Sequence, residues 1–562
     1  MSSEIEKRMG DGLLIPAAGL VAVVLFVQLP VTVYGGSPSD FDFGLVQLLP
    51  VWACLATGFF LALMAIAVRL SSDGRRRLAT SLWVAGVWIW VSGNVTVFSV
   101  GRLSGTPLDF GRARRWVIPE LLLGAAIVGV ALWLVARRPL IARRIACVVL
   151  AVASLVSVGR LLIDLPRWGS FSSTWPSSLT RFAGEDDVLV VLLDSFQSDV
   201  FAELVAEDED LVGSFDGFTY YPDTLGVART TALTMPAVHT GLRYDPAWTL
   251  DEYLERAGER DSFLTRVAGA GHEVTLVGPF GGCPLGGSWC GELDELISEP
   301  WADFWSEVFL PVDLAVFRVA PVWLKSGVYG RGRWLTLRLL RLHPGKEQQE
   351  RSHEFLERLT VEARVDVGPP TVKFLHLPAP HAPLVTGEGC ELVSEDLEKT
   401  RENLVVQSRC VLRRVADLLA TLSGLGILEG ATVILMSDHG AGLPAGVVSD
   451  EAEEFLERMT AANPLLAVKS PGAVGAMRES RQAVQIDDVG RTVCRAVEGC
   501  RYRWGRFLTN PGPPGRPRQF LDYRWRTDDW YERGRIEVTT WEVRGPLDKQ
   551  ASWTRVDSGA EL

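Results

Sequence analysis

Five long apolar stretches in the first 165 residues restrict the possible folds of this chain more than any other feature. They lie at about 12–34, 44–69, 79–101, 116–136 and 141–163. Each has the roughly 20 residues that an α-helix needs to cross the hydrocarbon core of a bilayer. The first follows Lys7 and Arg8 without a convincing small-residue cleavage site, which favours a retained anchor over a signal peptide. We therefore predict a transmembrane domain of five helices at residues 1–165.

Basic residues in the short loops predict the orientation of these helices. The arginines at 75–77 and the two arginine pairs between 137 and 144 indicate cytoplasmic loops, whereas the loop at 35–43 has no Lys or Arg. Five crossings from a cytoplasmic N-terminus place the chain after about residue 164 outside the cytoplasm. The loop 101–116 holds four arginines and does not fit this rule. Contact of these arginines with lipid headgroups would account for it.

Charge divides the chain in the same way. Residues 1–170 carry 16 Lys and Arg against 9 Asp and Glu, a net charge of +7, while the whole chain carries −12, which leaves −19 for residues 171–562. An outer domain as acidic as this argues against nucleic acid as a partner.

The cysteines indicate an oxidising compartment for the second part of the chain. Cys54 and Cys147 fall in predicted membrane helices, where a thiol is a small apolar filler. The other six are Cys283, Cys290, Cys390, Cys410, Cys494 and Cys500. An even number of cysteines outside the cytoplasm predicts disulfides between sequence neighbours, with CPLGGSWC (283–290) as the tightest candidate. A zinc knuckle is the alternative for that segment, although no histidine or CxxC motif lies near it.

The outer part of the chain has the pattern of an α/β domain. The runs DVLVVLLD (187–194) and ATVILMSD (431–438) are continuous and apolar, as expected for strands that are buried on both faces. Helical patterns occur at 347–365 and 400–424. Buried strands that alternate with helices predict a mostly parallel sheet.

Polar residues stand at the ends of both predicted strands. Asp194 ends the first strand, and Asp438 and His439 end the second. An aspartate often serves only to cap the turn after a strand. The segments RTTALTMPAVHTG (229–241) and HLPAPHAPL (376–384) add hydroxyl and imidazole groups, in a chain with seven histidines. Because ligands bind beyond the carboxyl ends of such strands, the combination predicts a functional site there.

These motifs resemble those of the alkaline phosphatase and sulfatase superfamily, and within it the membrane-anchored lipoteichoic acid synthases and phosphoethanolamine transferases. The resemblance covers residues 187–500 and implies a sulfatase-like fold for that domain. It implies that one divalent cation is held by Asp194, Thr231, Asp438 and His439. Thr231 rather than Thr230 matches the nucleophile, because it lies five residues before Pro236.

The resemblance also implies a catalytic role near the substrate for His381. His376 and Arg229 are candidates for substrate binding, and Arg229, two residues before Thr231, would add charge to a phosphate, although an arginine beside a turn is more often a surface residue. The chain departs from the transferases at two points. They usually have Glu where this chain has Asp194, and they have a further histidine after the DHG motif, whereas no histidine follows Gly440 here. These departures leave open whether a second metal binds and which acceptor is used.

The chemistry of the residues agrees with this assignment. A hydroxyl is a weak nucleophile, and a nearby divalent cation is a standard means of activating it. Two carboxylates, one imidazole and a hydroxyl favour zinc or manganese, with calcium or magnesium as further possibilities. A sulfate-ester hydrolase of this superfamily needs a Cys or Ser that is oxidised to formylglycine, so Thr231 favours phosphoryl chemistry through a phosphothreonine.

We therefore predict a multi-pass cell-membrane enzyme that transfers a phosphorylated headgroup from a membrane phospholipid donor to an envelope glycan or lipid acceptor. Two alternatives are a phosphoester hydrolase of the same superfamily and a catalytically inactive lipid-binding sensor of the same fold.

The predicted domains are the transmembrane domain at 1–165, a linker at 166–185, the extracytoplasmic catalytic domain at 186–505 and a strand-rich extension at 506–562. The aromatic segment 300–335 is expected either as a satellite core or as an element at the bilayer surface. The extension is expected to add an edge to the sheet. Ser195 and Ser198 are expected to cap the helix that follows Asp194.

Overall fold

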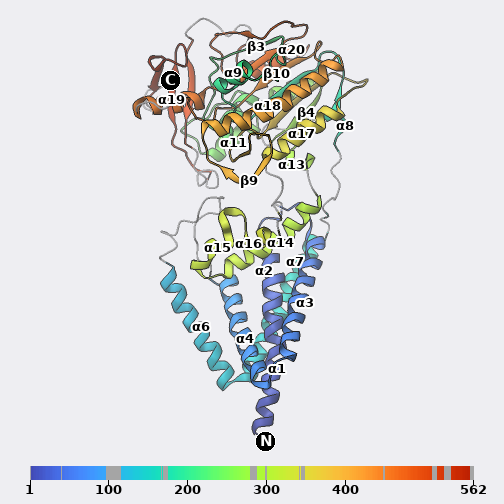
Figure 1. Cartoon of the computed structure of the whole chain (residues 1–562), viewed down its shortest axis with the longest axis vertical. Coiled ribbons are helices and arrows are strands. Elements are labelled where there is room, and N and C mark those ends of the chain that lie inside the picture. Colours follow the sequence, from blue (N-terminus) through green and yellow to red (C-terminus); the bar gives the residue numbers. More distant parts are fainter. Residues whose placement is uncertain are drawn as a thin grey trace. The chain divides into compact units, whose positions relative to one another are not determined.

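The chain forms two compact units. The computed structural model describes residues 2–38, 41–96, 116–165, 168, 175–278, 288–297, 300–340, 342, 348–446, 450–508, 516–524 and 533–556. Unit 1 comprises Met1–Ser173 and Ser298–Gly345, and unit 2 comprises Thr174–Ile297 and Lys346–Leu562. Figure 1 colours the chain from the N-terminus in blue to the C-terminus in red.

Unit 1 is helical. Its N-terminal helices are α1 (Ser2–Val23), α2 (Leu29–Gly36), α3 (Leu45–Val68), α4 (Ser72–Asn94), α6 (Val117–Arg137) and α7 (Pro139–Asp164), with one π-helical turn, Val24–Gln28, between α1 and α2. Four segments in the described part of the chain are long and apolar enough to cross a membrane: Gly12–Gly36, Leu45–Val68, Val117–Arg137 and Pro139–Asp164. The predicted count of five is not confirmed, because α4 begins with the charged sequence SDGRRR. The end of the third predicted span and nearly all of the loop 101–116 lie outside the described residues.

Helix α4 nevertheless packs closely against α1 and α2. A Cβ on Gly86 would lie 2.9 Å from Leu20 Cδ2, and one on Gly93 would lie 2.7 Å from Leu29 Cδ2. Small residues allow helix backbones to approach in this way, as is common in membrane bundles. The amide of Gln28 donates to the Asn94 side chain at 2.7 Å.

The aromatic segment 300–335 belongs to unit 1. It forms α14 (Pro300–Val319), a 3₁₀ turn (Val322–Leu324), α15 (Lys325–Tyr329) and the start of α16 (Leu335–Leu340). The indole N–H of Trp52 in α3 donates to Val308 O at 2.8 Å, and that of Trp88 in α4 donates to Val319 O at 3.0 Å. The Glu307 carboxylate accepts two backbone N–H groups from the loop between α2 and α3. The predicted continuous range 186–505 is therefore corrected, because this segment packs on the helices of unit 1 (Figure 1).

Unit 2 is built on an eight-stranded sheet. Its strands are β2 (Val188–Leu193), β3 (Phe218–Tyr220), β4 (Glu273–Val277), β5 (Trp289–Gly291), β7 (Thr371–Leu377), β10 (Thr432–Met436), β11 (Leu466–Lys469) and β12 (Arg478–Glu479). They lie in the order β12-β3-β11-β10-β2-β7-β4-β5. Only β11 runs antiparallel to its neighbours among these strands, so the predicted mostly parallel sheet is confirmed.

Helices cover both faces of this sheet. The helices of unit 2 are α8 (Ser177–Thr180), α9 (Ser198–Glu207), α10 (Thr231–Thr240), α11 (Leu250–Gly258), α12 (Phe263–Gly269), α13 (Leu293–Leu296), α17 (Gln348–Glu362), α18 (Arg401–Gly424), α19 (Asp450–Ala462) and α20 (Val489–Ala496). Leu189, Val191 and Leu193 of β2 pack in the core with α9, α17 and α18. The alternate residues Val188, Val190 and Leu192 pack in the core with α10, α12 and α20. Burial on both faces explains why β2 is apolar at every position.

The predicted linker 166–185 is partly wrong. Residues 177–182 form α8 and β1 (Arg181–Phe182), which pairs with β6 (Arg364–Val365). Phe182 is buried, and the ammonium group of Lys373 in β7 donates to Arg181 O at 2.7 Å. This end of the expected linker is therefore part of the core of unit 2.

The C-terminal extension contains strands, as predicted, but they do not extend the large sheet. β13 (Arg518–Asp522), β14 (Thr539–Val543) and β15 (Trp553–Val556) form a separate antiparallel sheet. Buried Arg518 donates to Asp223 O at 2.6 Å and to Gly545 O at 2.8 Å. The bond to Asp223 joins the small sheet to the segment after β3. The expected added edge is wrong, because these three strands form a sheet of their own. A further hairpin, β8 (Leu384–Thr386) and β9 (Leu392–Leu397), follows β7.

Two of the predicted disulfides are present. Cys390 is bonded to Cys410, and Cys494 is bonded to Cys500. Cys54 and Cys147 are free thiols. Cys283 lies outside the described residues, so its pairing with Cys290 stays a prediction.

Candidate metal centre and nucleophile

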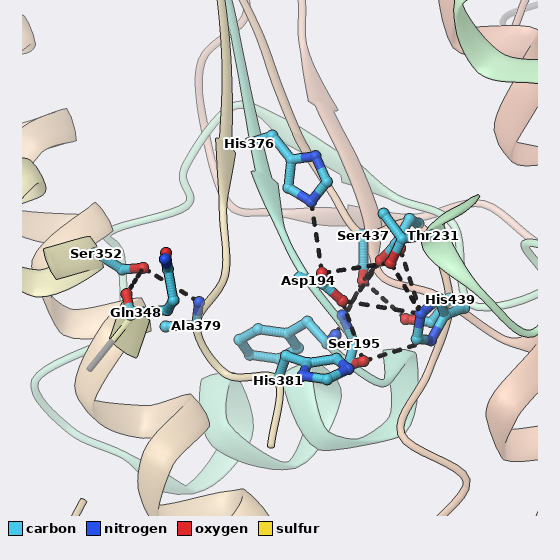
Figure 2. Close-up of polar contacts among 12 residues, drawn as sticks. Asp194, Ser195, Thr231, Gln348, Ser352, His376, Ala379, His381, Ser437 and His439 are labelled. Carbon is cyan, nitrogen blue, oxygen red and sulfur yellow. Dashed lines mark hydrogen bonds and ion pairs between the residues drawn. The ribbon is translucent and has the colours of Figure 1, made fainter. Parts of the chain in front are cut away.

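Three neighbouring strands bring the candidate residues together. Asp194 directly follows β2, His376 is the last residue but one of β7, and Asp438 and His439 follow β10. Because β10, β2 and β7 are adjacent and parallel, their carboxyl ends meet at one edge of the sheet. Thr231 is the first residue of α10. Figure 2 shows His376, Thr231 and His439 arranged around Asp194.

Two local features fix the turns after β2 and β10. Ser195 has φ 63°, a left-handed conformation that is uncommon for a residue other than glycine and is typical of functional sites. In that conformation the Ser195 N–H donates to Asp438 Oδ1 at 3.2 Å, which joins the two strand ends. A Cβ on Gly440 would lie 2.0 Å from Thr460 O, so the DHG turn requires glycine at its third position.

The acids and the imidazole fit a divalent cation. Ligand atoms of Asp194, Asp438 and His439 all lie within 4.8 Å of one another. His439 Nε2 is 3.3 Å from Asp438 Oδ2 and 3.8 Å from Asp194 Oδ1. Asp438 is 0% exposed, and its Oδ2 accepts no hydrogen bond. A buried carboxylate oxygen without a donor is costly, and a cation at this position would satisfy it.

Thr231, and not Thr230, faces this cluster. Thr231 Oγ1 lies 3.4 Å from Asp194 Oδ2 and 3.4 Å from His439 Nε2. Thr230 is the N-cap residue of α10, and its hydroxyl is buried without a hydrogen-bond partner. The helix dipole places partial positive charge at the N-terminus of α10, which favours an anionic group beside Thr231.

The two other predicted histidines lie on either side of Asp194. His376 is buried, with Nε2 at 3.5 Å from Asp194 Oδ2. His381 is exposed in the loop after β7, with its ring centroid 6.4 Å from that of His439. Burial acts to raise the pKa of Asp194, but the imidazoles of His381, His376 and His439 outweigh it and hold that pKa below its ordinary value. The carboxyl group is therefore ionised, as a metal ligand must be.

Arg229 reaches the same cavity with its guanidinium already paired. It forms ion pairs with Glu457 and, at 3.4 Å, with Asp522. These contacts hold the side chain against α19 and β13. A substrate-binding role for Arg229 stays a prediction.

Sequence reasoning missed two serines of the site. Ser195 Oγ donates to Asp194 Oδ1 at 3.2 Å and lies 3.4 Å from His439 Nδ1. The expected helix caps are wrong, because Gln197 is the N-cap of α9 and the Ser198 hydroxyl lies 2.8 Å from Tyr220 OH. Ser437 Oγ donates to His439 O at 2.8 Å. The sequence feature that could have indicated them is their position, because each serine is next to an aspartate at the end of a strand.

The cluster opens into a cavity of about 780 Å³. This volume is in the range of sites for small organic ligands. Apolar side chains such as Leu384, Leu404 and Leu443 form part of the lining, and the cations Lys399 and Arg524 lie on it as well. A ligand with both an anionic and an apolar portion matches this lining.

Comparisons with known proteins give likenesses at the level of structure. No family model and no curated protein sequence matches the chain. Among solved structures, the phosphonate monoester hydrolase of Agrobacterium radiobacter has 15% identity and a TM-score of 0.36, with 66% of this chain and 88% of that chain covered. The phosphonate monoester hydrolase SpPMH from Silicibacter pomeroyi has 14% identity and a TM-score of 0.39, with 64% and 85% covered. The lipoteichoic acid synthase LtaP from Listeria monocytogenes has 12% identity and a TM-score of 0.36, with 70% and 91% covered.

These names match the superfamily that the motifs resemble. At such identities and TM-scores the likeness adds no argument about activity, which rests on the residues of the site.

Proposed function

We propose that this chain is a metal-dependent transferase that moves a phosphorylated headgroup from a membrane phospholipid to an envelope glycan or lipid through Thr231. One observation carries the proposal. The Thr231 hydroxyl lies 3.4 Å from both Asp194 and His439, in a cluster with Asp438, whose buried Oδ2 accepts no hydrogen bond. A hydroxyl in this position matches a nucleophile next to a cation site.

The first half of the reaction forms a phosphothreonine. Thr231 Oγ1 gives its proton to solvent and bonds to phosphorus, while the bond from phosphorus to the lipid alcohol breaks. His381 donates a proton to that alcohol oxygen, so the released product is neutral diacylglycerol. Asp194, Asp438 and His439 would hold a zinc or manganese ion, with calcium or magnesium as further possibilities, and its positive charge would favour the deprotonated hydroxyl.

The second half returns the enzyme to its starting state. A hydroxyl of the acceptor bonds to phosphorus and gives its proton to His381. The bond from phosphorus to Thr231 Oγ1 breaks, and Thr231 regains a proton from solvent. His376 contacts Asp194 from the side of β7 and orients that carboxylate in both halves. Water in place of the acceptor would make the same site a phosphoester hydrolase.

A trapped intermediate tests this proposal. We expect the full chain, incubated with a headgroup-labelled phospholipid and no acceptor, to release diacylglycerol and to retain label on the peptide that contains TTALTMP. Phosphatidylglycerol and phosphatidylethanolamine, run in parallel, would identify the donor headgroup. Free labelled headgroup at a steady rate would favour the hydrolase, and neither product with any donor would favour the inactive sensor.

The topology that this function needs depends on α4. Four crossings would leave unit 2 on the same side of the membrane as the N-terminus, whereas five place it on the opposite side. The disulfides Cys390–Cys410 and Cys494–Cys500 favour an oxidising compartment for unit 2. The close packing of Gly86 and Gly93 supports α4 as a membrane crossing in addition to the four segments that are apolar enough to span.

Reporter fusions measure this topology directly. A reporter that is active only outside the cytoplasm is expected to give no signal after Arg77 and full signal after residue 175, because α4 and two further helices lie between these points. The matched control is a reporter that is active only in the cytoplasm, fused at the same two places. Cytoplasmic activity after residue 175 would contradict both the fifth crossing and the envelope acceptor.

A further inference from the structure

A second cavity of unit 2 is unusually basic. Its volume is about 990 Å³, and it shares no lining residue with the catalytic cavity. The arginines that line it are Arg260, Arg266, Arg491, Arg495, Arg501 and Arg503. The carboxylates in the lining are Asp261 and Glu498. We call this cavity the arginine groove. It stands out because residues 171–562 carry a net charge of −19.

Aromatic rings hold the guanidinium groups of the arginine groove in pairs. Arg491 and Arg495, one turn apart on α20, lie 4.6 and 4.7 Å from the centroid of the Phe507 ring. Like charges at this helical spacing repel each other. An anion between the two guanidinium groups would relieve that repulsion.

A second pair is built in the same way. Arg260 and Arg503 lie 5.3 and 4.6 Å from the centroid of the Trp504 ring. The Cys494–Cys500 disulfide ties α20 to the loop that carries Arg503 and Trp504. Of the four paired arginines, Arg495 lies within this closed segment, and Arg491 and Arg503 flank it on either side.

Most of these arginines are available for a ligand. Arg266 is paired with Asp261 at 2.6 Å, and Arg491 donates to Gly505 O at 3.0 Å. Within the part of the chain that the structure describes, no carboxylate forms an ion pair with the remaining four: Arg260, Arg495, Arg501 and Arg503. All four are exposed.

We propose that the arginine groove binds a chain of repeated phosphate groups. Two guanidinium pairs on two rings offer places for at least two anionic groups on one ligand. All six cations are arginines, whose planar fork matches the oxygens of a phosphate better than the point charge of lysine does. A concave groove suits a flexible chain, because a flat bilayer surface cannot enter it.

The groove lies at the far end of the helix that carries the nucleophile. A Cβ on Gly241, the C-cap of α10, would lie 2.4 Å from Trp504 Cγ. Tyr502 OH donates to His239 O, in the last turn of the same helix, at 3.1 Å. A helix of ten residues is about 15 Å long, so a chain bound in the groove is well separated from Thr231. The proposal goes beyond the proposed reaction and holds whether the site transfers or hydrolyses.

Binding of a short polyphosphate chain to the full protein in uncharged detergent tests this inference. We expect the Arg495→Gln/Arg503→Gln double variant to bind about tenfold more weakly than wild type, with a smaller dependence of affinity on salt concentration. The matched control is Arg481→Gln, which removes an arginine that is 81% exposed and paired with Glu479. It is expected to bind as wild type does. All three proteins are expected to unfold at the same temperature, because the altered side chains are exposed.

Binding measurements with other phosphate compounds distinguish the possible ligands. Orthophosphate is expected to bind much more weakly than the polyphosphate chain, since it occupies one guanidinium pair at most. Equal affinity of the double variant and wild type for polyphosphate would overturn the proposal. So would equal weakening by Arg481→Gln, which would indicate nonspecific attraction. If the double variant lost binding to phosphatidylglycerol vesicles but not to polyphosphate, the groove would be a lipid contact and the proposal would be wrong.

Discussion

Thr231→Ala is expected to lower turnover by at least about 10³-fold while leaving the fold and the metal content unchanged. The substitution removes the only atom of this side chain that can attack phosphorus. The contacts that it loses are long, at 3.4 Å to Asp194 and 3.4 Å to His439, so little stability depends on them. Alanine also suits the first turn of α10. Release of diacylglycerol, metal content and thermal unfolding are the measurements.

Thr230→Ala is the matched control. It removes the neighbouring hydroxyl, which is buried and makes no hydrogen bond, from the same helix start. We expect turnover within a few-fold of wild type, because that hydroxyl forms no hydrogen bond with the acids or with His439. Survival of turnover in Thr231→Ala, or loss of turnover in Thr230→Ala alone with label on Thr230, would rule out the proposed nucleophile.

Local pattern was sufficient to predict the strands and the acids that follow them. The apolar runs at 187–194 and 431–438 became β2 and β10, because only strands buried on both faces are apolar throughout. Their order in the sheet then brought Asp194 beside Asp438, although 243 residues separate Ser195 from the Asp438 oxygen to which it donates. The choice of Thr231 came from the resemblance, through its spacing of five residues before Pro236.

The parts that could not be predicted depend on contacts between distant segments. The place of α14 depends on acceptors for indole N–H groups, such as Val308 O for Trp52, which lies 256 residues away. The separate sheet at the C-terminus has the same alternating pattern as an added edge strand, so the partner strand is not encoded locally. The left-handed conformation of Ser195 is likewise invisible in its sequence.

The arginine groove likewise could not be predicted from the positions of charged residues in the sequence. Its arginines come from three segments between Arg260 and Arg503, and in the sequence they are dispersed through an acidic region. The sequence around Trp504 and Phe507 does not indicate that guanidinium groups lie over their rings, as they do in the structure. The net charge of −19 argued against nucleic acid as a partner, whereas the fold brings these arginines together around one cavity.

Asp438→Asn is expected to reduce the metal content from about one ion per chain to a small fraction and to abolish turnover in parallel. An amide is neutral and a weak ligand, so the site would lose both charge and affinity. The carbonyl oxygen of the new amide side chain can still accept from the Ser195 N–H, which preserves the turn. Elemental analysis of the purified protein and release of diacylglycerol are the measurements.

The unfolding temperature provides a second, independent test of Asp438→Asn. Without metal, Asp438→Asn is expected to unfold at a temperature no lower than that of metal-free wild type, because it removes a buried charge whose Oδ2 has no donor. With metal, wild type alone is expected to gain stability through binding to the folded state. A wild type that holds no metal and whose unfolding does not respond to added zinc or manganese would contradict the metal centre.

Asp187→Asn is the matched control for Asp438→Asn, since Asp187 is also buried but lies at the opposite end of β2. Its carboxylate accepts from the N–H and hydroxyl of Thr371 and from the Gly184 N–H, each at 2.8 Å. Replacing this satisfied group is expected to lower the unfolding temperature and to leave the metal content unchanged. If both variants lost metal equally, the loss would reflect general destabilisation of the sheet, and Asp438 would no longer be assigned as a ligand.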